Sequence, residues 1–360
     1  MRRTRDLHPV SRNASRVFMI MSSQAFRAKQ FRLENGDLLP ELELAYVTHG
    51  RLAPDGRNAV LLTHGYTSSH HMVDVGDAAA EGYWGGLVGP GKPIDTDRLF
   101  VIASNMLGSA YGSTGPASID PRTGNPYGPD FPDISLVDIV TAQRALLDSL
   151  GVKHLVAVAG PSYGGFQAFQ WAVTFPDFVT GIVPAISSPR SPSGASSLDE
   201  LVAYLARDPN WNGGRYYERG GILPTLTQLR IDTLKLYGIE QQLTPAFPDS
   251  AACEAEIRRR AETWAREFDA HALIVLRRAN IRFDVEPEFA KIKARVLYVL
   301  SRTDRIFPPS LAARVMPKLA AQGITAEYVE IDTDLGHSSG GVDAARWAPQ
   351  LRRFMATLMP

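Results

Sequence analysis

Short, almost continuous runs of apolar residues recur along the chain and end near Gly or Asn. They span residues 58–65, 99–105, 154–160, 181–186, 294–300 and 326–331. Strands that are apolar throughout are typical of a parallel sheet covered on both faces, because neither side of such a strand meets water. Between two of these runs, apolar residues at helical spacing from Leu136 to Leu150 predict a helix that Gly151 ends. The alternation of strands and helices predicts an α/β fold.

This alternation stops after Ile186. A link rich in Ser, Pro and Gly (187–194) leads into a charged region, where residues 198–207 and 254–278 have helical patterns. No apolar run of comparable quality lies between them. We therefore expect a helical lid, residues 187–282, that is inserted over the carboxyl edge of the sheet.

The rest of the chain is predicted to be a core and an N-terminal extension. The core combines residues 26–186 with residues 283–360. Residues 1–25 are rich in Arg, and their apolar run is too short for the hydrophobic region of a secretory signal. We expect a disordered extension with Met19 or Met21 as an alternative start, and not a targeting peptide.

Composition and charge narrow the function. Of the 360 residues, 44% are hydrophobic and 21% are charged, which is ordinary for a globular protein. Lys and Arg (38) balance Asp and Glu (38), so no general positive field would attract nucleic acid or an anionic membrane. No stretch reaches the roughly 18 apolar residues of a membrane span, and a cytoplasmic location is expected. The single cysteine, Cys253, excludes an intrachain disulfide and a multi-cysteine metal site.

The segment Gly160-Pro-Ser162-Tyr-Gly164 fits the pattern G-x-S-x-G. It follows an apolar run and precedes a stretch with helical spacing, and this strand–turn–helix setting is that of the nucleophile elbow in the α/β-hydrolase fold. Glycines flank the serine because a side chain there would collide with neighbouring backbone. The turn would raise the Ser162 hydroxyl above the sheet, at the positive end of the following helix. Ser162 is therefore the predicted nucleophile.

A serine hydroxyl needs a base, and the base needs a group that orients it. In this fold the two follow the nucleophile in the order acid and then His. Asp304 and His337 each come shortly after an apolar run, so both belong at the carboxyl ends of strands, where α/β folds place their sites. Asp332 and Asp334 compete for the role of the acid, but their closeness to His337 in sequence favours solvated loop charges. We predict that Asp304 orients His337.

The oxyanion of the reaction should be bound by backbone N–H groups. One belongs to Tyr163, directly after the nucleophile, and the other to the turn after the first apolar run, where Tyr66 is the best candidate. His64, His70 and His71 lie near this turn, but no Asp or Glu completes a recognisable set of metal ligands. We therefore expect no metal and no cofactor.

From about Phe31 to the C-terminus, the sequence resembles the homoserine O-acetyltransferase group of the α/β-hydrolase superfamily. Besides the elbow, the resemblance rests on residues 39–46, 89–98, 104–108, 113–119, 208–214 and 307–309. It implies a mostly parallel sheet with helices on both faces and a helical lid that makes a tunnel to the serine. It also implies Ser162 as nucleophile, Asp304 as acid and His337 as base, and a homodimer formed through the lid helices.

Two features depart from this group, and a third has two interpretations. In its transferases an Asp that binds the amino group of homoserine typically follows the catalytic His, whereas this chain has Ser338. A lid motif that usually reads Phe-Asp-x-Asn-x-Tyr is Phe-Asp-Ala-His-Ala-Leu at residues 268–273. Arg230 either matches the lid arginine that recognises the acceptor's carboxylate or is a solvated helix residue. Without the Asp, a buried ammonium would stay unpaired at a cost of about 3–5 kcal/mol, which disfavours homoserine.

We therefore expect an enzyme that cleaves a small carboxylic ester through an acyl-serine intermediate. The alternative is an O-acyltransferase that uses acetyl-CoA as a co-substrate and acts on homoserine or another hydroxyl compound. Both share the formation of the acyl-enzyme, and transfer additionally requires a site that positions the acceptor against water. A third alternative, a protein that keeps the fold but only binds ligands, is disfavoured by the complete set of Ser, Asp and His.

Overall fold

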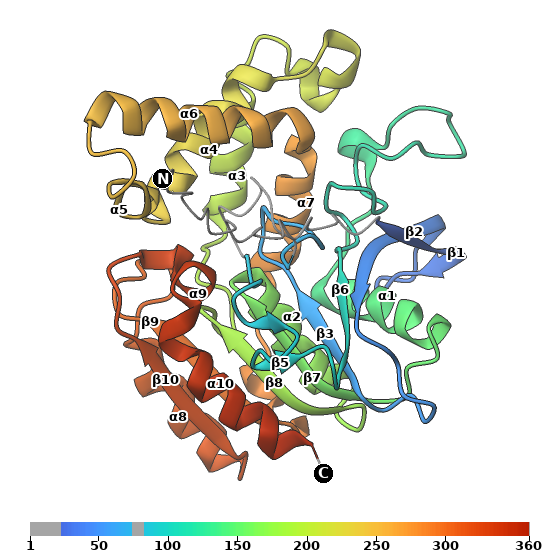
Figure 1. Ribbon diagram of the computed structural model, residues 1–360. Coiled ribbons are helices and arrows are strands. Elements are labelled where there is room, and N and C mark those ends of the chain that lie inside the picture. The colour runs from blue at the N-terminus through green and yellow to red at the C-terminus, as the bar shows by residue number, and fades with distance from the viewer. Residues whose placement is uncertain (1–22, 74–82, 360) are drawn as a thin grey trace, which may run out of the picture.

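The computed structural model of the chain describes residues 23–73 and 83–359. An eight-stranded sheet in the order β1-β2-β6-β3-β7-β8-β9-β10 forms its centre (Figure 1). The parallel strands are β3 (Ala59–Thr63), β6 (Phe100–Ser104), β7 (Leu155–Pro161), β8 (Val179–Ala185), β9 (Arg295–Ser301) and β10 (Ala326–Ile331). They coincide with the six apolar runs, so the predicted α/β-hydrolase fold is confirmed.

One edge of the sheet is antiparallel. Strands β1 (Gln24–Arg32) and β2 (Leu38–His49) pair with each other, and β2 pairs with β6. A separate pair, β4 (Val88–Gly89) with β5 (Ile94–Asp95), lies outside the main sheet. Because β1 begins at Gln24, it already contains the last residues of the expected N-terminal extension, 1–25; residues 1–22 lie outside the described part of the chain.

Helices cover both faces of the sheet. On one face, α1 (Leu136–Ser149), α2 (Tyr163–Thr174) and α8 (Leu311–Ala321) share a hydrophobic core with Leu61 of β3. On the other face, α10 (Ala344–Leu358) packs against Val60 and Leu62 of the same strand, and the short α9 (Ser339–Val342) precedes it. Neighbouring residues of β3 thus point to opposite cores, which is why this strand is buried along its whole length.

The start of α1 is explained by the hydrogen bonds of its first turn. Ser135 accepts a hydrogen bond from the backbone N–H of Asp138 (3.2 Å), and the Asp138 carboxylate accepts the N–H of Ser135 (2.8 Å). This reciprocal pair satisfies two N–H groups that would otherwise have no partner at the start of a helix. Helix α1 therefore begins where the sequence pattern places it.

Between β8 and β9 the chain forms a layer of helices above the sheet (Figure 1). We call this the helical layer; its members are α3 (Ser196–Leu205), α4 (Leu223–Leu236), α5 (Ile239–Leu243), α6 (Ser250–Glu267) and α7 (Ala270–Ile281). The prediction of a single helix over residues 254–278 was wrong: this stretch is divided into α6 and α7 at Phe268 and Asp269, whose backbone is extended. Helix α7 begins among the apolar residues of this layer and ends in the core around α1 and α2.

None of the helices in the described residues is both long and apolar enough to cross a membrane.

Candidate active site

Ser162 lies in the turn between β7 and α2. Its backbone has φ 55° and ψ −120°, a region that residues other than glycine rarely adopt. The turn is fastened to the end of β8, because the N–H of Ser162 donates to the carbonyl of Ala185 (2.9 Å). The hydroxyl of Ser187 in turn donates to the carbonyl of Ser162 (2.7 Å). These contacts hold the backbone of the predicted nucleophile in its strained conformation.

The glycines of the elbow are required by β3. A Cβ atom on Gly160 would lie 2.0 Å from the carbonyl oxygen of Thr63, and one on Gly164 would lie 2.1 Å from the same atom. Such contacts are far inside van der Waals distance, so any side chain at either position would push β3 away from the turn. The spacing G-x-S-x-G thus follows from how closely the elbow approaches the neighbouring strand.

Asp304 and His337 meet at the carboxyl ends of β9 and β10. The Nδ1 of His337 lies 2.8 Å from Oδ2 of Asp304, and both side chains are buried. The other carboxylate oxygen accepts the backbone N–H groups of Ile306 (2.8 Å) and Phe307 (3.2 Å). Burial acts to raise the pKa of Asp304, but the interaction with His337 and the two amide donors outweigh it, so this pKa lies below 3.8.

The ionised state of Asp304 determines the tautomer of His337. A carboxylate only accepts hydrogen bonds, so Nδ1 of the imidazole carries the proton and donates it to Asp304. In the neutral ring Nε2 is then the acceptor, as a general base requires. Asp332 and Asp334, the competing acids, instead form exposed ion pairs with Arg302.

Ser162 opens into a cavity of about 300 Å³ between the sheet and the helical layer. Its walls come from both parts, with Phe307 from the core and Tyr237, at the end of α4, from the helices. The ring of His337 packs against both of these residues, with centroid distances of 4.6 Å to Tyr237 and 5.7 Å to Phe307. The acid–base pair therefore packs against two walls of the cavity into which the predicted nucleophile opens.

The predicted oxyanion donors lie on either side of Ser162. Tyr163 is the first residue of α2, so its backbone N–H has no acceptor within the helix. Tyr66 follows Gly65, at which an added Cβ would lie 3.9 Å from the Cβ of Ser162. The rings of Tyr66 and Tyr163 stack with centroids 5.9 Å apart and both line the cavity.

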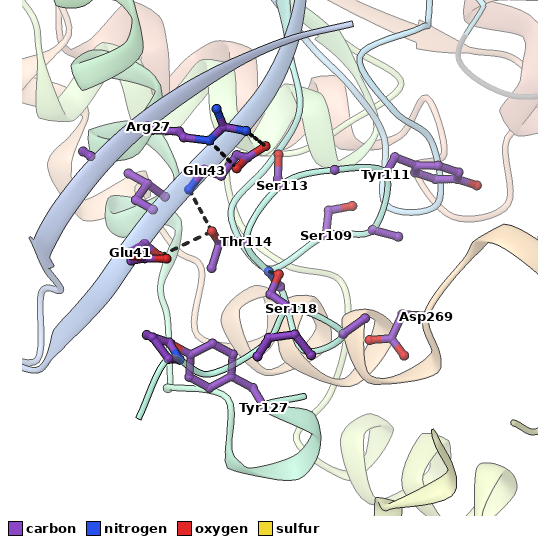
Figure 2. Close-up of a pocket in the computed structure, with 18 of the residues that line it drawn as sticks. Arg27, Glu41, Glu43, Ser109, Tyr111, Ser113, Thr114, Ser118, Tyr127 and Asp269 are labelled. Carbon is purple, nitrogen blue, oxygen red and sulfur yellow. Dashed lines mark hydrogen bonds and ion pairs between the residues drawn. The ribbon is translucent and has the colours of Figure 1, made fainter. Parts of the chain in front are cut away.

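A larger cavity of about 650 Å³ lies elsewhere, between the β1–β2 edge and the loop that contains Thr114 (Figure 2). Two of its charged residues are paired, since Arg27 forms an ion pair with Glu43 (2.8 Å). Thr114 accepts the backbone N–H of Glu43 (2.7 Å). Ser162 is not among the described walls of this larger cavity, whereas it does line the smaller one. The smaller cavity is therefore the candidate active site.

Comparison with known proteins agrees with this architecture. A family model described as the alpha/beta hydrolase fold matches residues 58–344. A homoserine O-acetyltransferase of Symbiobacterium thermophilum is 36% identical over 351 residues, which cover 91% of this chain and 92% of the relative. A homoserine O-succinyltransferase of Methylibium petroleiphilum is 35% identical, with 91% of each chain covered. The chain belongs to the homoserine O-acetyltransferase-like group of the α/β-hydrolase family.

Solved structures of this family superimpose well on the chain. Esterase E22 has a TM-score of 0.83 at 29% identity, covering 93% of this chain and 100% of its own. The homoserine O-acetyltransferase from Bacillus anthracis has a TM-score of 0.82 at 27% identity, covering 94% and 98%. This α/β-hydrolase is thus similar in fold both to an esterase and to an acyltransferase.

Arg230, the candidate for carboxylate recognition, lies on α4 and is buried. Its guanidinium donates to the hydroxyl of Thr67 (2.9 Å) and lies 4.8 Å from the ring centroid of Trp264. Thr67 lines the cavity of this α/β-hydrolase, but Arg230 is not among the described walls. A solvated helix arginine, the alternative interpretation, is wrong because the side chain is enclosed.

Sequence reasoning missed two residues of α7 that do line the cavity, Arg277 and Asn280. They are three positions apart and so project from the same face of the helix. The sequence does contain a signal for Arg277, because this residue directly follows the apolar stretch Ala272–Leu276, which is buried. A cation at the end of so apolar a segment is unusual on a helix that merely faces solvent.

The histidines near the first turn have separate partners. His64 contacts the carbonyl of Gly65 through Nδ1 (2.8 Å), and His70 contacts the hydroxyl of Ser23 (2.6 Å). Over residues 23–73 and 83–359, no three His, Cys, Asp or Glu side chains are grouped in a way that could hold a metal ion.

Proposed function

We propose that the protein is a serine-dependent O-acyltransferase that moves an acyl group from a thioester such as acetyl-CoA to a hydroxyl compound through an acyl-Ser162 intermediate. The observation that carries the proposal is the Asp304–His337 pair, buried against the walls of the cavity into which Ser162 opens. The homoserine acyltransferases at 35–36% identity support transfer as the overall reaction.

In the first half of the reaction, Nε2 of His337 takes the proton of the Ser162 hydroxyl while Oγ attacks the acyl carbonyl. The carbonyl oxygen becomes an oxyanion that accepts hydrogen bonds from the backbone N–H groups of Tyr66 and Tyr163. Collapse of this intermediate breaks the bond to the leaving thiol or alcohol, which receives the proton from His337. Asp304 stabilises the imidazolium in between.

In the second half, His337 takes a proton from the acceptor hydroxyl, which attacks the acyl-serine and releases Ser162. Transfer exceeds hydrolysis only if the acceptor is held close to the acyl carbon, since positioning supplies a high effective concentration against water. The walls contributed by the helical layer support such a role. The residues alone predict hydrolysis, whereas the homoserine acyltransferases among the relatives favour transfer.

Hydrolysis of a small ester is the second candidate, and Ser338 favours it. The Asp that the family resemblance implies at this position is absent, and the hydroxyl of Ser338 donates to the carbonyl of Tyr237 (3.3 Å). No carboxylate belongs to the described walls of the cavity, so within them nothing would neutralise the ammonium group of homoserine. The likeness to esterase E22 also supports this candidate.

The deciding experiment supplies purified protein with acetyl-CoA, with and without homoserine or other hydroxyl compounds, and then with 4-nitrophenyl acetate. Thiol release that depends on a hydroxyl acceptor supports the transferase. Cleavage of the ester without any acceptor-dependent thiol release overturns it in favour of the hydrolase. Ser162→Ala is the control, and failure of a fluorophosphonate to label the unmutated protein at Ser162 would exclude an acyl-enzyme altogether.

A further inference from the structure

Helix α7 carries a cation into the cavity of Ser162. The Arg277 side chain is largely enclosed, and its guanidinium lies 5.3 Å from the ring centroid of Tyr66, the residue whose amide is a proposed oxyanion donor. One terminal nitrogen donates to the hydroxyl of Ser193 (3.1 Å), which also lines the cavity. The charge of Arg277 therefore lies in the wall of the cavity that Ser162 also lines.

This cation has no anion beside it in the described part of the chain. The ionisable groups that act most strongly on Arg277 are the phenols of Tyr66, Tyr237 and Tyr163, and the phenol oxygen of Tyr66 also accepts a hydrogen bond from the guanidinium. Burial raises the pKa of Tyr66 above its ordinary value of 10.0, so this phenol is neutral at neutral pH. The buried Nε of Arg277 has no hydrogen-bond partner. An enclosed guanidinium without a counter-charge is unfavourable, and a bound anion would relieve that cost.

Besides the Nε of Arg277, a second buried polar atom at the same place lacks a hydrogen-bond partner among the described residues. Asn280 is 8% exposed, lines the cavity, and has a buried Oδ1 that accepts no hydrogen bond among the described residues. It follows Arg277 by three residues on α7, so the two side chains lie on one helical face. The rest of the wall around them is mainly apolar, with Leu273, Ile306 and Phe307. Unpaired polar groups in an apolar pocket are typical of sites that recognise one polar part of a ligand.

We propose that Arg277, together with Asn280, binds a carboxylate of the substrate and thereby selects anionic esters over neutral ones. Arginine suits this role because its planar guanidinium presents paired N–H donors that match the two oxygens of a carboxylate. The carboxylate belongs either to the acyl group, as in a half-ester of a dicarboxylic acid, or to the alcohol. The inference rests on the proposed function, since it concerns the same cavity, but it holds for transfer and for hydrolysis alike.

Two pairs of esters distinguish the sources of the carboxylate. Monoethyl succinate carries it on the acyl side, and ethyl succinamate is its neutral counterpart of the same shape. 4-Acetoxybutanoate carries it on the alcohol side, and 4-acetoxybutanamide is its neutral counterpart. For each ester, kcat/KM is measured by titration of the acid released. We expect the unmutated protein to prefer the charged member of at least one pair by about 10- to 100-fold, as a charge-assisted hydrogen bond supplies.

The variant Arg277→Met should abolish this preference by lowering kcat/KM for the charged ester about 10- to 100-fold, with less than about threefold change for the neutral one. Arg277→Lys keeps the charge and should retain part of the preference. Arg278→Met, the same change at the next residue, which is not among the described walls, is the matched control and should leave both pairs unchanged. If Arg277→Met loses the preference for the charged ester only in the acyl-side pair, the carboxylate belongs to the acyl group. If it loses the preference only in the alcohol-side pair, the carboxylate belongs to the alcohol.

Three outcomes separate the inference from the proposed function. Equal charged-to-neutral ratios in the unmutated protein and in Arg277→Met would overturn the carboxylate site while leaving the acyl-enzyme intact. Absence of fluorophosphonate labelling at Ser162 would overturn the proposed function instead. If Arg277→Met does not fold, the unmutated protein still decides: stronger competitive inhibition by butyrate than by butyramide supports the site, and equal inhibition contradicts it.

Discussion

The part of the chain that the structure describes contains a buried Asp and His at the sheet and another buried Asp and His in the helical layer. At the sheet, the imidazole of His337 donates to Asp304 (2.8 Å). In the helical layer, Asp269 and His271 are only two residues apart, yet the His271 ring turns away and donates from Nε2 to the carbonyl of Gly214 (2.6 Å). Asp269 accepts hydroxyl groups of tyrosines in place of the imidazole.

The pKa values of the two carboxyl groups move in opposite directions. Burial acts to raise both, but at Asp304 the interaction with His337 outweighs burial and the pKa falls below 3.8. At Asp269 burial dominates over the tyrosine hydroxyls and the more distant His271, and the pKa rises above 3.8. The presence of a buried Asp and a buried His close together is therefore not sufficient to form an acid–base pair. What matters is that the imidazole faces the carboxylate and lies against the cavity of the nucleophile.

The strongest test of this comparison is Asp304→Asn. The amide can no longer enforce the tautomer of His337 or stabilise the imidazolium, so we expect kcat for 4-nitrophenyl acetate to fall about 10⁴-fold. Circular dichroism and the melting temperature should show a folded protein. A fall of less than about tenfold would mean that Asp304 does not orient the base.

The corresponding change in the helical layer, Asp269→Leu, should act on stability. It leaves the hydroxyls of Tyr216 and Tyr217 without their acceptor, and we expect the free energy of unfolding to fall by about 2–4 kcal/mol. In the protein that remains folded, kcat should stay within about tenfold of its original value. Urea unfolding and active-site titration with a fluorophosphonate measure the two quantities separately. Loss of kcat at unchanged stability would contradict the distinction between the two pairs.

The loss of stability caused by Asp304→Asn should change with pH in the opposite direction to the loss caused by Asp269→Asn. Because the folded pKa of Asp304 is depressed, its stabilising contribution is present above the unfolded pKa, ordinarily 3.8, and is lost as the pH falls through the folded pKa. The folded pKa of Asp269 is raised, so its contribution is fully present below 3.8 and is lost as the pH rises through the folded pKa. Urea unfolding from about pH 3 to about pH 6 should show the deficit of Asp304→Asn growing with pH and that of Asp269→Asn shrinking. Parallel curves would refute the assignment.

The smallest effect is expected for Asp334→Asn. Asp334 precedes His337 closely in sequence, but its side chain is 79% exposed and paired only with the exposed Arg302. Exposed ion pairs contribute little, so kcat and the melting temperature should not change measurably. A marked loss of kcat here would make Asp334, and not Asp304, the acid of the site.

The sequence was sufficient to predict the parallel strands, because residues such as Leu61 and Val60 face cores on opposite sides and leave a mainly apolar run. It was sufficient for the elbow as well, since Gly160 and Gly164 are dictated by the local approach to Thr63. The antiparallel β1 was not predicted. This edge strand exposes most of its polar side chains and so lacks a continuous apolar pattern.

What escaped prediction depends on contacts between distant segments. The break between α6 and α7 occurs where Asp269 accepts hydroxyls from Tyr216 and Tyr217, more than fifty residues earlier in the chain, and helical spacing carries no trace of this. Arg277 follows an apolar stretch of α7, but the pattern does not say which cavity its side chain enters. Its enclosure arises because α7 passes from the helical layer into the core beside Ser162. Local pattern thus predicts the candidate reactive groups, whereas tertiary packing decides which other side chains line their cavity.

The positive φ of Ser162 strains the backbone at the same residue whose side chain the proposed reaction requires. Glycine adopts φ 55° without the strain that any side chain incurs there, so Ser162→Gly should be more stable than Ser162→Ala by about 1 kcal/mol, although both lack the nucleophile. Under the proposed function, the acyl-enzyme chemistry requires a side chain at this position. In a descendant lineage released from that requirement, replacement of this serine by glycine would be favoured by folding itself, and such a replacement would mark the loss of catalysis in the sequence record.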